Sequence, residues 1–250
     1  MAKTIFITGA TSGFGKSTAK IFAQNGHNLI ITGRRKDRLD SLAEELKAKH
    51  NVSVVSLCFD VRDNQSVVSA INGLSNNNID VLINNAGLAS GLNKIQNGSL
   101  DDWEKMIDTN IKGLLYVSKT IMSLMINNKK GHIINIGSTA GKETYENGNV
   151  YCASKHAVDA ISKSMRIDLL EHGIKVTQIC PGAAETEFSE VRLHGDKEKA
   201  KKVYSGYKPM TAEDVASIIY YVTTLPKNLC INDLVVTSLA QANSFYINRT

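Results

Sequence analysis

Tyr151 and Lys155 lie four residues apart near the start of a stretch with helical periodicity. Side chains at this spacing share one face of a helix. A free phenol has a pKa of about 10, too high for a good general base at neutral pH, and a nearby lysine ammonium favours the phenolate and lowers that pKa. The pair can therefore exchange a proton with an alcohol or a carbonyl. The same spacing also occurs by chance on surface helices, so alone it is weak evidence.

Ser138 follows a short apolar run at Ile133–Ile136. If that run is a strand, the serine hydroxyl lies just beyond its end and can reach the same reacting oxygen as Tyr151. The competing interpretation is an ordinary loop serine.

A glycine-rich turn follows the first apolar run of the chain and precedes a helical pattern. It consists of Gly9, Ala10, Thr11, Ser12, Gly13, Phe14 and Gly15. Glycines allow a tight turn and a close approach of the backbone to a pyrophosphate, whose charge is met by the helix N-terminus. Such turns are common, but a strand before and a helix after provide the context that dinucleotide binding requires.

Gly33, Arg34 and Arg35 follow the second apolar run. A site for NAD has an acid here, about 20 residues past the glycines, to bind the ribose 2′-hydroxyl. Two arginines favour a 2′-phosphate instead, because a guanidinium binds phosphate through charge-assisted hydrogen bonds. The cofactor is therefore predicted to be NADP. In the alternative interpretation, the arginines neutralise Asp37 and Asp40 of the next helix.

Two further strand ends carry residues that suit a dinucleotide. Asp60 and Val61 can contact an adenine ring, although Asp60 or Asp63 can equally cap a helix. Asn85 and Gly87 follow the fourth apolar run, where small and amide residues suit a turn close to a ligand. A plain polar turn is the alternative at this point.

Short branched apolar runs alternate with longer segments of helical periodicity, which predicts an α/β protein. The expected strands are Thr4–Thr8, Leu29–Thr32, Val52–Leu57, Asp80–Asn84, Ile133–Ile136, Lys175–Ile179 and Leu234–Thr237. The expected helices are Lys16–Gln24, Lys36–Lys49, Asn64–Ile71, Leu100–Ile126, Tyr151–Glu171 and Ala212–Thr223. Nearly continuous apolar strands favour one doubly wound, Rossmann-type domain over residues 1–250, with a seven-stranded parallel sheet covered by helices on both faces. In such a fold, ligands bind at the carboxyl ends of the strands.

Composition narrows the class of protein. The chain has 250 residues, 42% of them apolar and 21% charged, which excludes a disordered chain. Its net charge is +5, but the basic residues are scattered, so we expect a small-molecule substrate and no nucleic acid. No apolar run is long enough to span a membrane, and Thr4–Thr8 is too short for a signal peptide. Four widely spaced cysteines predict no zinc site and a reduced, cytoplasmic setting.

Taken together, the motifs resemble those of the short-chain dehydrogenase/reductase family over almost the whole chain. The ordered series is Gly9–Gly15, Asn84–Gly87, Asn110, Ser138, Tyr151 with Lys155, and Pro181-Gly182. The resemblance implies that Tyr151 is the acid/base, that Lys155 holds the nicotinamide ribose and lowers the tyrosine pKa, and that Ser138 orients the substrate oxygen. It also implies that Asn110 anchors a water in a proton relay through Lys155.

Further contacts are implied by the same resemblance. Pro181, Gly182, Thr186 and Phe188 would line the nicotinamide end, with Thr186 bound to the carboxamide. Family members are commonly homotetramers paired through two long helices, so the resemblance also implies that assembly here.

A closer likeness is to the branch of NADP-dependent 3-hydroxy acid dehydrogenases, also called L-allo-threonine or serine dehydrogenases. It is carried by the stretches 31–39, 84–91, 106–113, 132–141 and 186–192. The branch implies oxidation of a β-hydroxyl next to a carboxylate, or reduction of aldehydes such as malonic semialdehyde.

A carboxylate substrate needs a cation. Arg192 is one candidate because it lies in the expected substrate lid, about residues 183–210, and Lys142 is a second. The alternative for Arg192 is a surface position.

Two other functions remain open at this point. One keeps the mechanism and changes the substrate to a 3-oxoacyl thioester, ketone or aldehyde, because fold and catalytic residues do not set the substrate. The other is a protein that binds NADPH without turnover.

Overall fold

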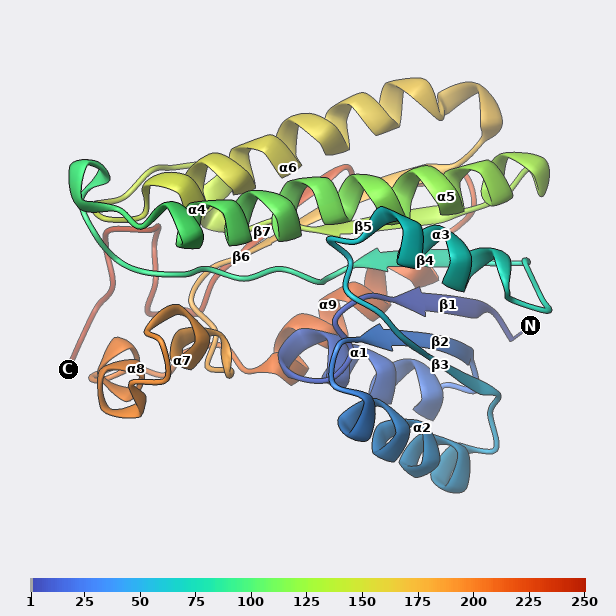
Figure 1. Ribbon diagram of the computed structural model, residues 1–250, viewed down its shortest axis with the longest axis horizontal. Helices are drawn as coiled ribbons and strands as arrows, with labels where there is room; N and C mark the ends of the chain where they lie inside the picture. The colour runs from blue at the N-terminus through green and yellow to red at the C-terminus, as the bar shows by residue number, and fades with distance from the viewer. Residues whose placement is uncertain (1) are drawn as a thin grey trace.

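The computed structural model describes residues 2–250, which form one seven-stranded, wholly parallel sheet between two layers of helices (Figure 1). The strands, in chain order, are β1 (Thr4–Ile7), β2 (Asn28–Gly33), β3 (Val54–Cys58), β4 (Val81–Asn84), β5 (His132–Ile136), β6 (Lys175–Pro181) and β7 (Asp233–Val236). Their order across the sheet is β3-β2-β1-β4-β5-β6-β7. The first crossovers therefore place β2 and β3 on one side of β1, and the later strands β4 to β7 lie on its other side. This confirms the predicted fold class.

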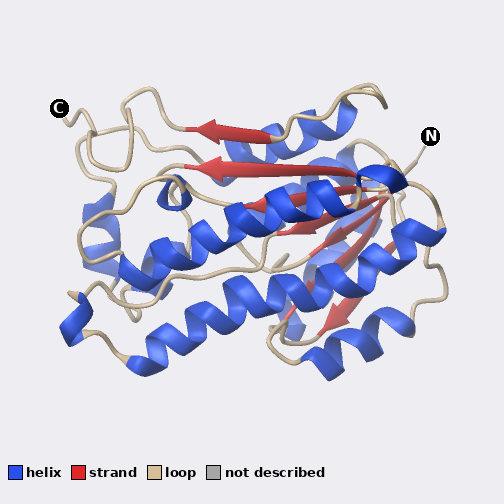
Figure 2. Cartoon of the chain, turned by 90° about the horizontal axis from the view of Figure 1, so that it is seen from above, coloured by secondary structure: helices blue, strands red, loops and turns tan. Residues whose placement is uncertain are grey.

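Helices connect the strands and lie on both faces of the sheet (Figure 2). They are α1 (Gly13–Gln24), α2 (Lys36–His50), α3 (Asn64–Asn72), α4 (Leu100–Ile107), α5 (Leu114–Asn127), α6 (Asn149–Asp168), α7 (Phe188–Arg192), α8 (Lys197–Val203) and α9 (Ala212–Thr224). Within residues 2–250, no helix is both long and apolar enough to cross a membrane.

Two apolar cores hold the layers together, one on each face. Strand side chains alternate between the faces, so Ile5 and Ile7 of β1 join the first core while Phe6 joins the second. Helices α1, α2 and α9 cover the first core, and α3, α5 and α6 cover the second. Burial on both faces is the reason that the central strands β1, β2 and β4 are mostly apolar in sequence, whereas the edge strands β3 and β7 are partly exposed.

Two segments differ from the sequence-based prediction. The helix expected over Leu100–Ile126 contains a π-helical stretch, Asp108–Gly113, between α4 and α5. The expected lid contains two short helices that the sequence analysis does not predict, α7 and α8, which Figure 1 shows together beside the C-terminus. Both features lie at the end of the molecule where the parallel strands finish.

Candidate active site

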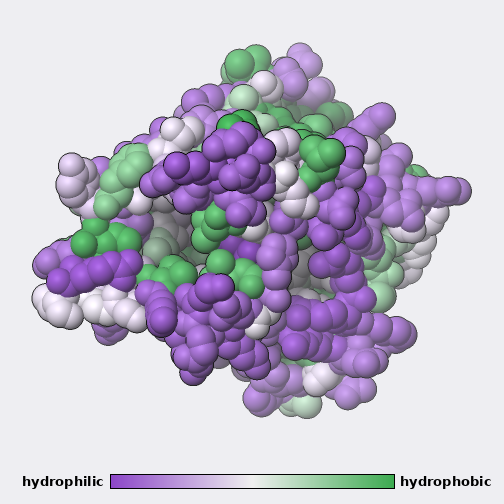
Figure 3. Space-filling model, turned by 60° about the vertical axis from the view of Figure 1, so that its left-hand side comes forward, coloured by the Kyte–Doolittle hydropathy of each residue, from purple (hydrophilic) through white to green (hydrophobic). Residues whose placement is uncertain are grey.

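A cleft of about 510 Å³ opens where the strands end. The face seen in Figure 3 is hollowed here, with apolar side chains around the hollow. Most of the residues predicted for the site line this cleft: Gly9, Thr11, Ser12, Gly13, Phe14, Arg34, Arg35, Asp60, Val61, Asn85, Gly87, Ser138, Tyr151, Lys155, Pro181, Gly182, Thr186, Phe188 and Arg192. Three lie behind its wall instead, namely Ala10, Gly15 and Asn110.

The glycine-rich turn has the shape that a close backbone approach requires. Gly9 and Gly13 have φ angles of +67° and +49°, in the left-handed region that favours glycine. A Cβ on Gly15 would lie 2.3 Å from the carbonyl oxygen of Gly9, so only glycine fits there. Helix α1 begins at Gly13, and its N-cap residue Ser12 makes no capping hydrogen bond through its side chain. The first N–H groups of α1 therefore remain free to bind an anion.

The two arginines after β2 turn toward the cleft rather than toward helix α2. Arg34 Nη1 lies 3.6 Å from Asp60, and Arg35 Nε and Nη2 lie 3.3 and 3.0 Å from the hydroxyl of Thr11. In the alternative interpretation they neutralise Asp37 and Asp40. The structure instead pairs Arg34 with Asp60 and Arg35 with Glu187, and Asp40 with Lys36.

Asp60 and Asp63 have different roles. Asp63 caps helix α3, accepting from the N–H groups of Gln65 and Ser66. Asp60 faces the cleft and accepts from Arg62 at 2.7 Å. Burial opposes ionisation of Asp60, but its hydrogen bonds with Arg62 prevail and lower its pKa. Asp60 is thus a carboxylate at the cleft wall, and the capping alternative holds for Asp63 alone.

The Asn85 side chain binds the glycine-rich turn. Its amide donates to the carbonyl oxygens of Thr8 and Gly9 at 2.8 and 3.2 Å, which joins the loop after β4 to the loop after β1. Asn85 therefore shapes the cofactor side of the cleft through the backbone of its neighbours.

Asn110 lies at the centre of the π-helical stretch and is 2% exposed. Its side-chain amide accepts from the N–H of Leu88 and donates to the carbonyl of Leu88, both at 2.8 Å. A Cβ on Gly87 would lie 3.2 Å from the Asn110 carbonyl oxygen and 3.6 Å from Lys155 Nζ. Gly87 thus leaves the gap in which Asn110 and Lys155 approach each other.

Lys155 is buried and donates a hydrogen bond of 2.9 Å to the carbonyl of Ile136. Burial disfavours the ammonium and lowers the pKa of Lys155 to about 8. The Nζ atom lies 5.9 Å from the ring centre of Tyr151, so the two side chains share one face of α6, as their spacing predicts.

The phenol of Tyr151 is held in its protonated form. Burial raises its pKa above the usual range, which outweighs the opposite effects of Ser138 and Arg192. Desolvation therefore dominates the pKa of Tyr151 in this structure, and the lowering expected from Lys155 is not seen. The ring of Phe188, on the lid, lies 5.6 Å from the Tyr151 ring and keeps that end of the cleft apolar.

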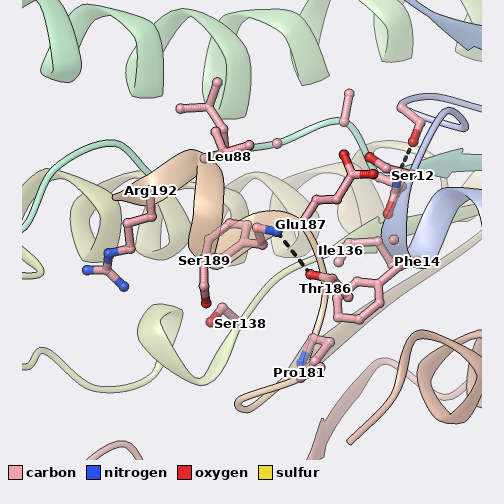
Figure 4. Close-up of a pocket in the computed structure, with 18 of the residues that line it drawn as sticks. Ser12, Phe14, Leu88, Ile136, Ser138, Pro181, Thr186, Glu187, Ser189 and Arg192 are labelled. Atoms are coloured by element: carbon pink, nitrogen blue, oxygen red, sulfur yellow. Dashed lines mark hydrogen bonds between the residues drawn. The ribbon is translucent and has the colours of Figure 1, made fainter. Parts of the chain in front are cut away.

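Arg192 reaches into the same end of the cleft, near Ser138 (Figure 4). Its Nη1 donates to the hydroxyl of Tyr145 at 2.9 Å, and its Cζ lies 5.5 Å from the ring centre of Tyr151. In the part of the chain that the structure describes, its Nε and Nη2 are buried without a hydrogen-bond partner. Unpaired buried donors on a cation are costly, so this position suits an anionic ligand. Lys142, the second candidate, is instead paired with Asp159 and Asp233.

Two residues of this site were missed by the sequence analysis. Tyr145 lies in an irregular loop before α6, and no periodicity marks it. Glu187 lies in the lid and pairs with Arg35, which is 152 positions away in sequence. The sequence shows an acidic residue in the lid and arginines after the second apolar run. Nothing in the sequence indicates that the two pair.

The doubly wound sheet, the glycine turn at α1 and the Tyr151–Lys155 pair define a dinucleotide-binding oxidoreductase. A family model described as short chain dehydrogenase matches residues 3–196. The chain belongs to this family.

Named relatives and a solved structure agree with that membership. NADP-dependent 3-hydroxy acid dehydrogenase YdfG of Salmonella typhi is 43% identical over 241 residues, which are 95% of this chain and 96% of that protein. Sulfoacetaldehyde reductase 2 of Chromohalobacter salexigens is 43% identical over 253 residues, covering both chains fully at 100%. The closed form of a serine dehydrogenase complexed with NADP⁺ superimposes with a TM-score of 0.91 at 41% identity, over 99% of this chain and 100% of the other.

Proposed function

We propose that this enzyme transfers a hydride between NADP(H) and small 3-hydroxy acids or their carbonyl forms. Substrates of this class include serine, allo-threonine and 3-hydroxypropionate. The observation that carries the proposal is the guanidinium of Arg192, whose two unpaired buried nitrogens lie close to the Tyr151 ring.

The cleft fits the dinucleotide at several points. The glycine turn leaves no room for a Cβ at Gly15, and the start of α1 offers free N–H groups to a pyrophosphate. Arg34 and Arg35 line the cleft and suit a 2′-phosphate, while Asp60 and Val61 suit the adenine. The relatives named for NADP use support the same cofactor. We expect Lys155 to hold the nicotinamide ribose, with Thr186 and Phe188 at the nicotinamide.

When bound, the nicotinamide supplies or accepts the hydride. In the reducing direction, the Tyr151 hydroxyl gives its proton to the carbonyl oxygen, and Ser138 donates a hydrogen bond that orients that oxygen. The raised pKa of Tyr151 keeps this proton on the phenol at neutral pH. We propose that the tyrosine is reprotonated through Lys155 and a water anchored near Asn110.

Arg192 supports a substrate with an acidic group close to the reacting carbon. A guanidinium binds a carboxylate through two parallel hydrogen bonds, and Arg192 has two free nitrogens. Its distance of 5.5 Å from the Tyr151 ring favours a short substrate, in which the anion and the carbonyl are close. A sulfonate presents similar oxygen acceptors, and one relative is named for a sulfonated aldehyde, so 2-sulfoacetaldehyde is a second candidate.

The test is initial-rate absorbance at 340 nm with NADP or NAD. Serine, allo-threonine, 3-hydroxypropionate and 2-hydroxyethanesulfonate would be compared with the uncharged methyl ester of 3-hydroxypropionate. We expect turnover of at least one anionic alcohol with NADP and loss of activity in Tyr151→Phe. Arg192→Gln should lower kcat/KM for the anions at least tenfold, since it removes charge-assisted hydrogen bonds, and should leave the ester almost unaffected.

Other outcomes would reject parts of this proposal. Turnover of ketones or 3-oxoacyl thioesters alone would keep the mechanism and discard the substrate class. NADPH binding without turnover of any carbonyl substrate would favour the non-catalytic alternative. Preference for NAD would contradict the role given to Arg34 and Arg35.

We also propose that the protein acts as a homotetramer in the cytoplasm. Exposed apolar side chains on the long helices, such as Leu115 of α5 and Ile167 of α6, suit contacts between copies. The four cysteines are free thiols, the state in which a reducing compartment keeps them. A light-scattering mass near the 27.2 kDa of one chain would exclude the tetramer.

A further inference from the structure

Glu187 links the lid to the segment that follows β2. It is the N-cap residue of α7, and one carboxylate oxygen lies 2.8 Å from Arg38 Nη1. The other oxygen lies 3.0 Å from Arg35 Nη1 and 3.1 Å from Arg38 Nη1. Burial opposes ionisation of Glu187, but hydrogen bonds with the two arginines prevail and lower its pKa, so the link is between full charges.

Arg35 uses different nitrogens for its two neighbours. While Nη1 binds Glu187, the Nε–Nη2 edge faces the hydroxyls of Thr11 and Ser12 on the glycine-rich turn. In this structure the N–H groups of that edge donate to the two hydroxyls. A phosphate that replaced the hydroxyls would meet the edge in two-point contact and leave Nη1 on Glu187, so Arg35 could bind the lid and a phosphate at the same time.

Arg38 provides a second anchor for the lid outside the cleft. Its side chain is half exposed and bonds to both oxygens of Glu187, but Arg38 does not contribute to the cleft wall. The lid thus stays attached to α2 even when Arg35 turns partly toward a ligand.

The far end of α7 is attached to the substrate side of the cleft. The N–H of Gly91 donates to the backbone carbonyl of Arg192 at 2.9 Å, and His194 lies 3.4 Å from the buried carboxylate of Asp102. Glu187 and Arg192 therefore stand at the two ends of one short helix. Glu187 is thus connected to the candidate anion site through this one helix of five residues.

We propose that Glu187 is a positioning residue that couples the cofactor's 2′-phosphate to the lid. By holding Arg35 from the lid side, Glu187 orients the guanidinium edge toward the phosphate and keeps α7 with Arg192 closed over the cleft. The inference rests on the proposed function, because it assumes that Arg35 meets a 2′-phosphate and Arg192 meets the substrate. Its consequence is that NADP(H), but not NAD(H), draws the lid toward its closed position.

The primary test compares binding of NADPH and NADH, without substrate, by the fluorescence of the reduced nicotinamide. In Glu187→Gln we expect the Kd for NADPH to rise roughly threefold to tenfold, as suits half-exposed ion pairs, and the Kd for NADH to change less than twofold. The loss should shrink at high ionic strength, because salt screens the arginines. Glu190→Gln is the matched control, since it removes the same charge from α7 at a position outside the cleft wall.

A second variant tests the link from outside the cleft. Arg38→Gln should reproduce part of the NADPH loss, and the double variant with Glu187→Gln should bind no more weakly than Glu187→Gln alone. With NADPH present, both single variants should raise the KM for the anionic substrate with little change in kcat. Additive losses would overturn the proposal, because they would mean that the two residues act separately.

The results also separate this inference from the function on which it depends. If the wild-type enzyme does not prefer NADPH over NADH, both ideas fail. If it prefers NADPH and Glu187→Gln keeps that preference unchanged, or binds NADPH more tightly, only the coupling is overturned. Equal weakening of NADPH and NADH would also overturn it, because a structural defect in the lid does not distinguish the two cofactors.

Discussion

The Lys155 ammonium lies 2.9 Å from the carbonyl oxygen of Ile136, the last residue of β5. This hydrogen bond fixes the lysine at the end of the strand that also leads to Ser138. It satisfies one of the three ammonium protons, and burial makes the charge costly enough to lower the pKa of Lys155 to about 8. The lysine therefore changes charge within a pH range that enzyme assays can reach.

We expect the reducing activity to fall as pH rises through about 8. Below that pH the Lys155 side chain carries a proton that can be passed toward Tyr151, and above it the proton is lost. The measurement is kcat/KM for aldehyde reduction against pH, which reports groups of the free enzyme. Constant activity from pH 7 to 10 would contradict the assignment to Lys155.

Replacing Lys155 by methionine should abolish turnover and stabilise the fold. The pKa of Lys155 is lowered in the folded state, so folding disfavours its charged form at all pH values below about 8. This penalty falls as pH rises from about 8 toward 10.5, the ordinary pKa of a lysine, where the unfolded chain also loses the proton. At pH 7 we expect Lys155→Met to gain more than about 1 kcal/mol in the free energy of unfolding. Thermal unfolding at several pH values would check this, and a gain that grew between pH 8 and 10 would contradict it.

Arg34→Gln should weaken the preference for NADP. The guanidinium lines the cleft and is the first positive charge after β2, so its loss removes a charge-assisted hydrogen bond from a 2′-phosphate. We expect the KM for NADP to rise roughly tenfold while that for NAD stays nearly constant. Lys36→Gln is the control, because it makes the same charge change at an exposed residue that is paired with Asp40. If the two substitutions had equal effects, the loss would reflect the overall positive potential of this region and not a specific contact between Arg34 and the 2′-phosphate.

Asn110→Ala should lower the stability of the protein as well as its rate of turnover. The substitution leaves the half-buried N–H and carbonyl of Leu88 without their partner and removes a donor to Ser154. We expect a loss of about 2–4 kcal/mol in the free energy of unfolding, measured with denaturant. Asn127→Ala, at the exposed end of α5, should change it by less than about 0.5 kcal/mol. A similar loss of unfolding free energy in both variants would show that the hydrogen bonds to Leu88 do not contribute specifically to stability.

The parts that could be predicted from sequence are those dictated by local pattern. Every expected strand is present, and the pattern is clearest where a strand is buried on both faces and mostly apolar, as in Val81–Ile83 of β4. The helix start expected at Ala212 is also confirmed, because Thr211 and Asp214 form a capping box there. The glycine turn could be located because its chemistry and its place after β1 agree.

The remaining features depend on contacts that sequence spacing does not contain. The π-helical stretch brings Asn110 to Leu88, a neighbour in space on a different loop. The raised pKa of Tyr151 follows mainly from burial of its side chain, which the spacing of Tyr151 and Lys155 does not reveal. The partner of Arg35 is Glu187, which lies in the lid. This ion pair on the phosphate side of the cleft could therefore not be predicted from the sequence.

The strand order has a consequence for the way the chain is made. After β3 has joined β2, every later strand adds to the opposite edge of the sheet in the order of the sequence, from β4 to β7. A chain that emerges from the ribosome can therefore extend its sheet at one edge without rearranging strands already paired. The glycine turn and its arginines precede Tyr151 and Arg192 in the sequence. The side chain of Gln241 lines the cleft and accepts from the N–H of Ala183 at the base of the lid, so the pocket is completed only after β7 has been made.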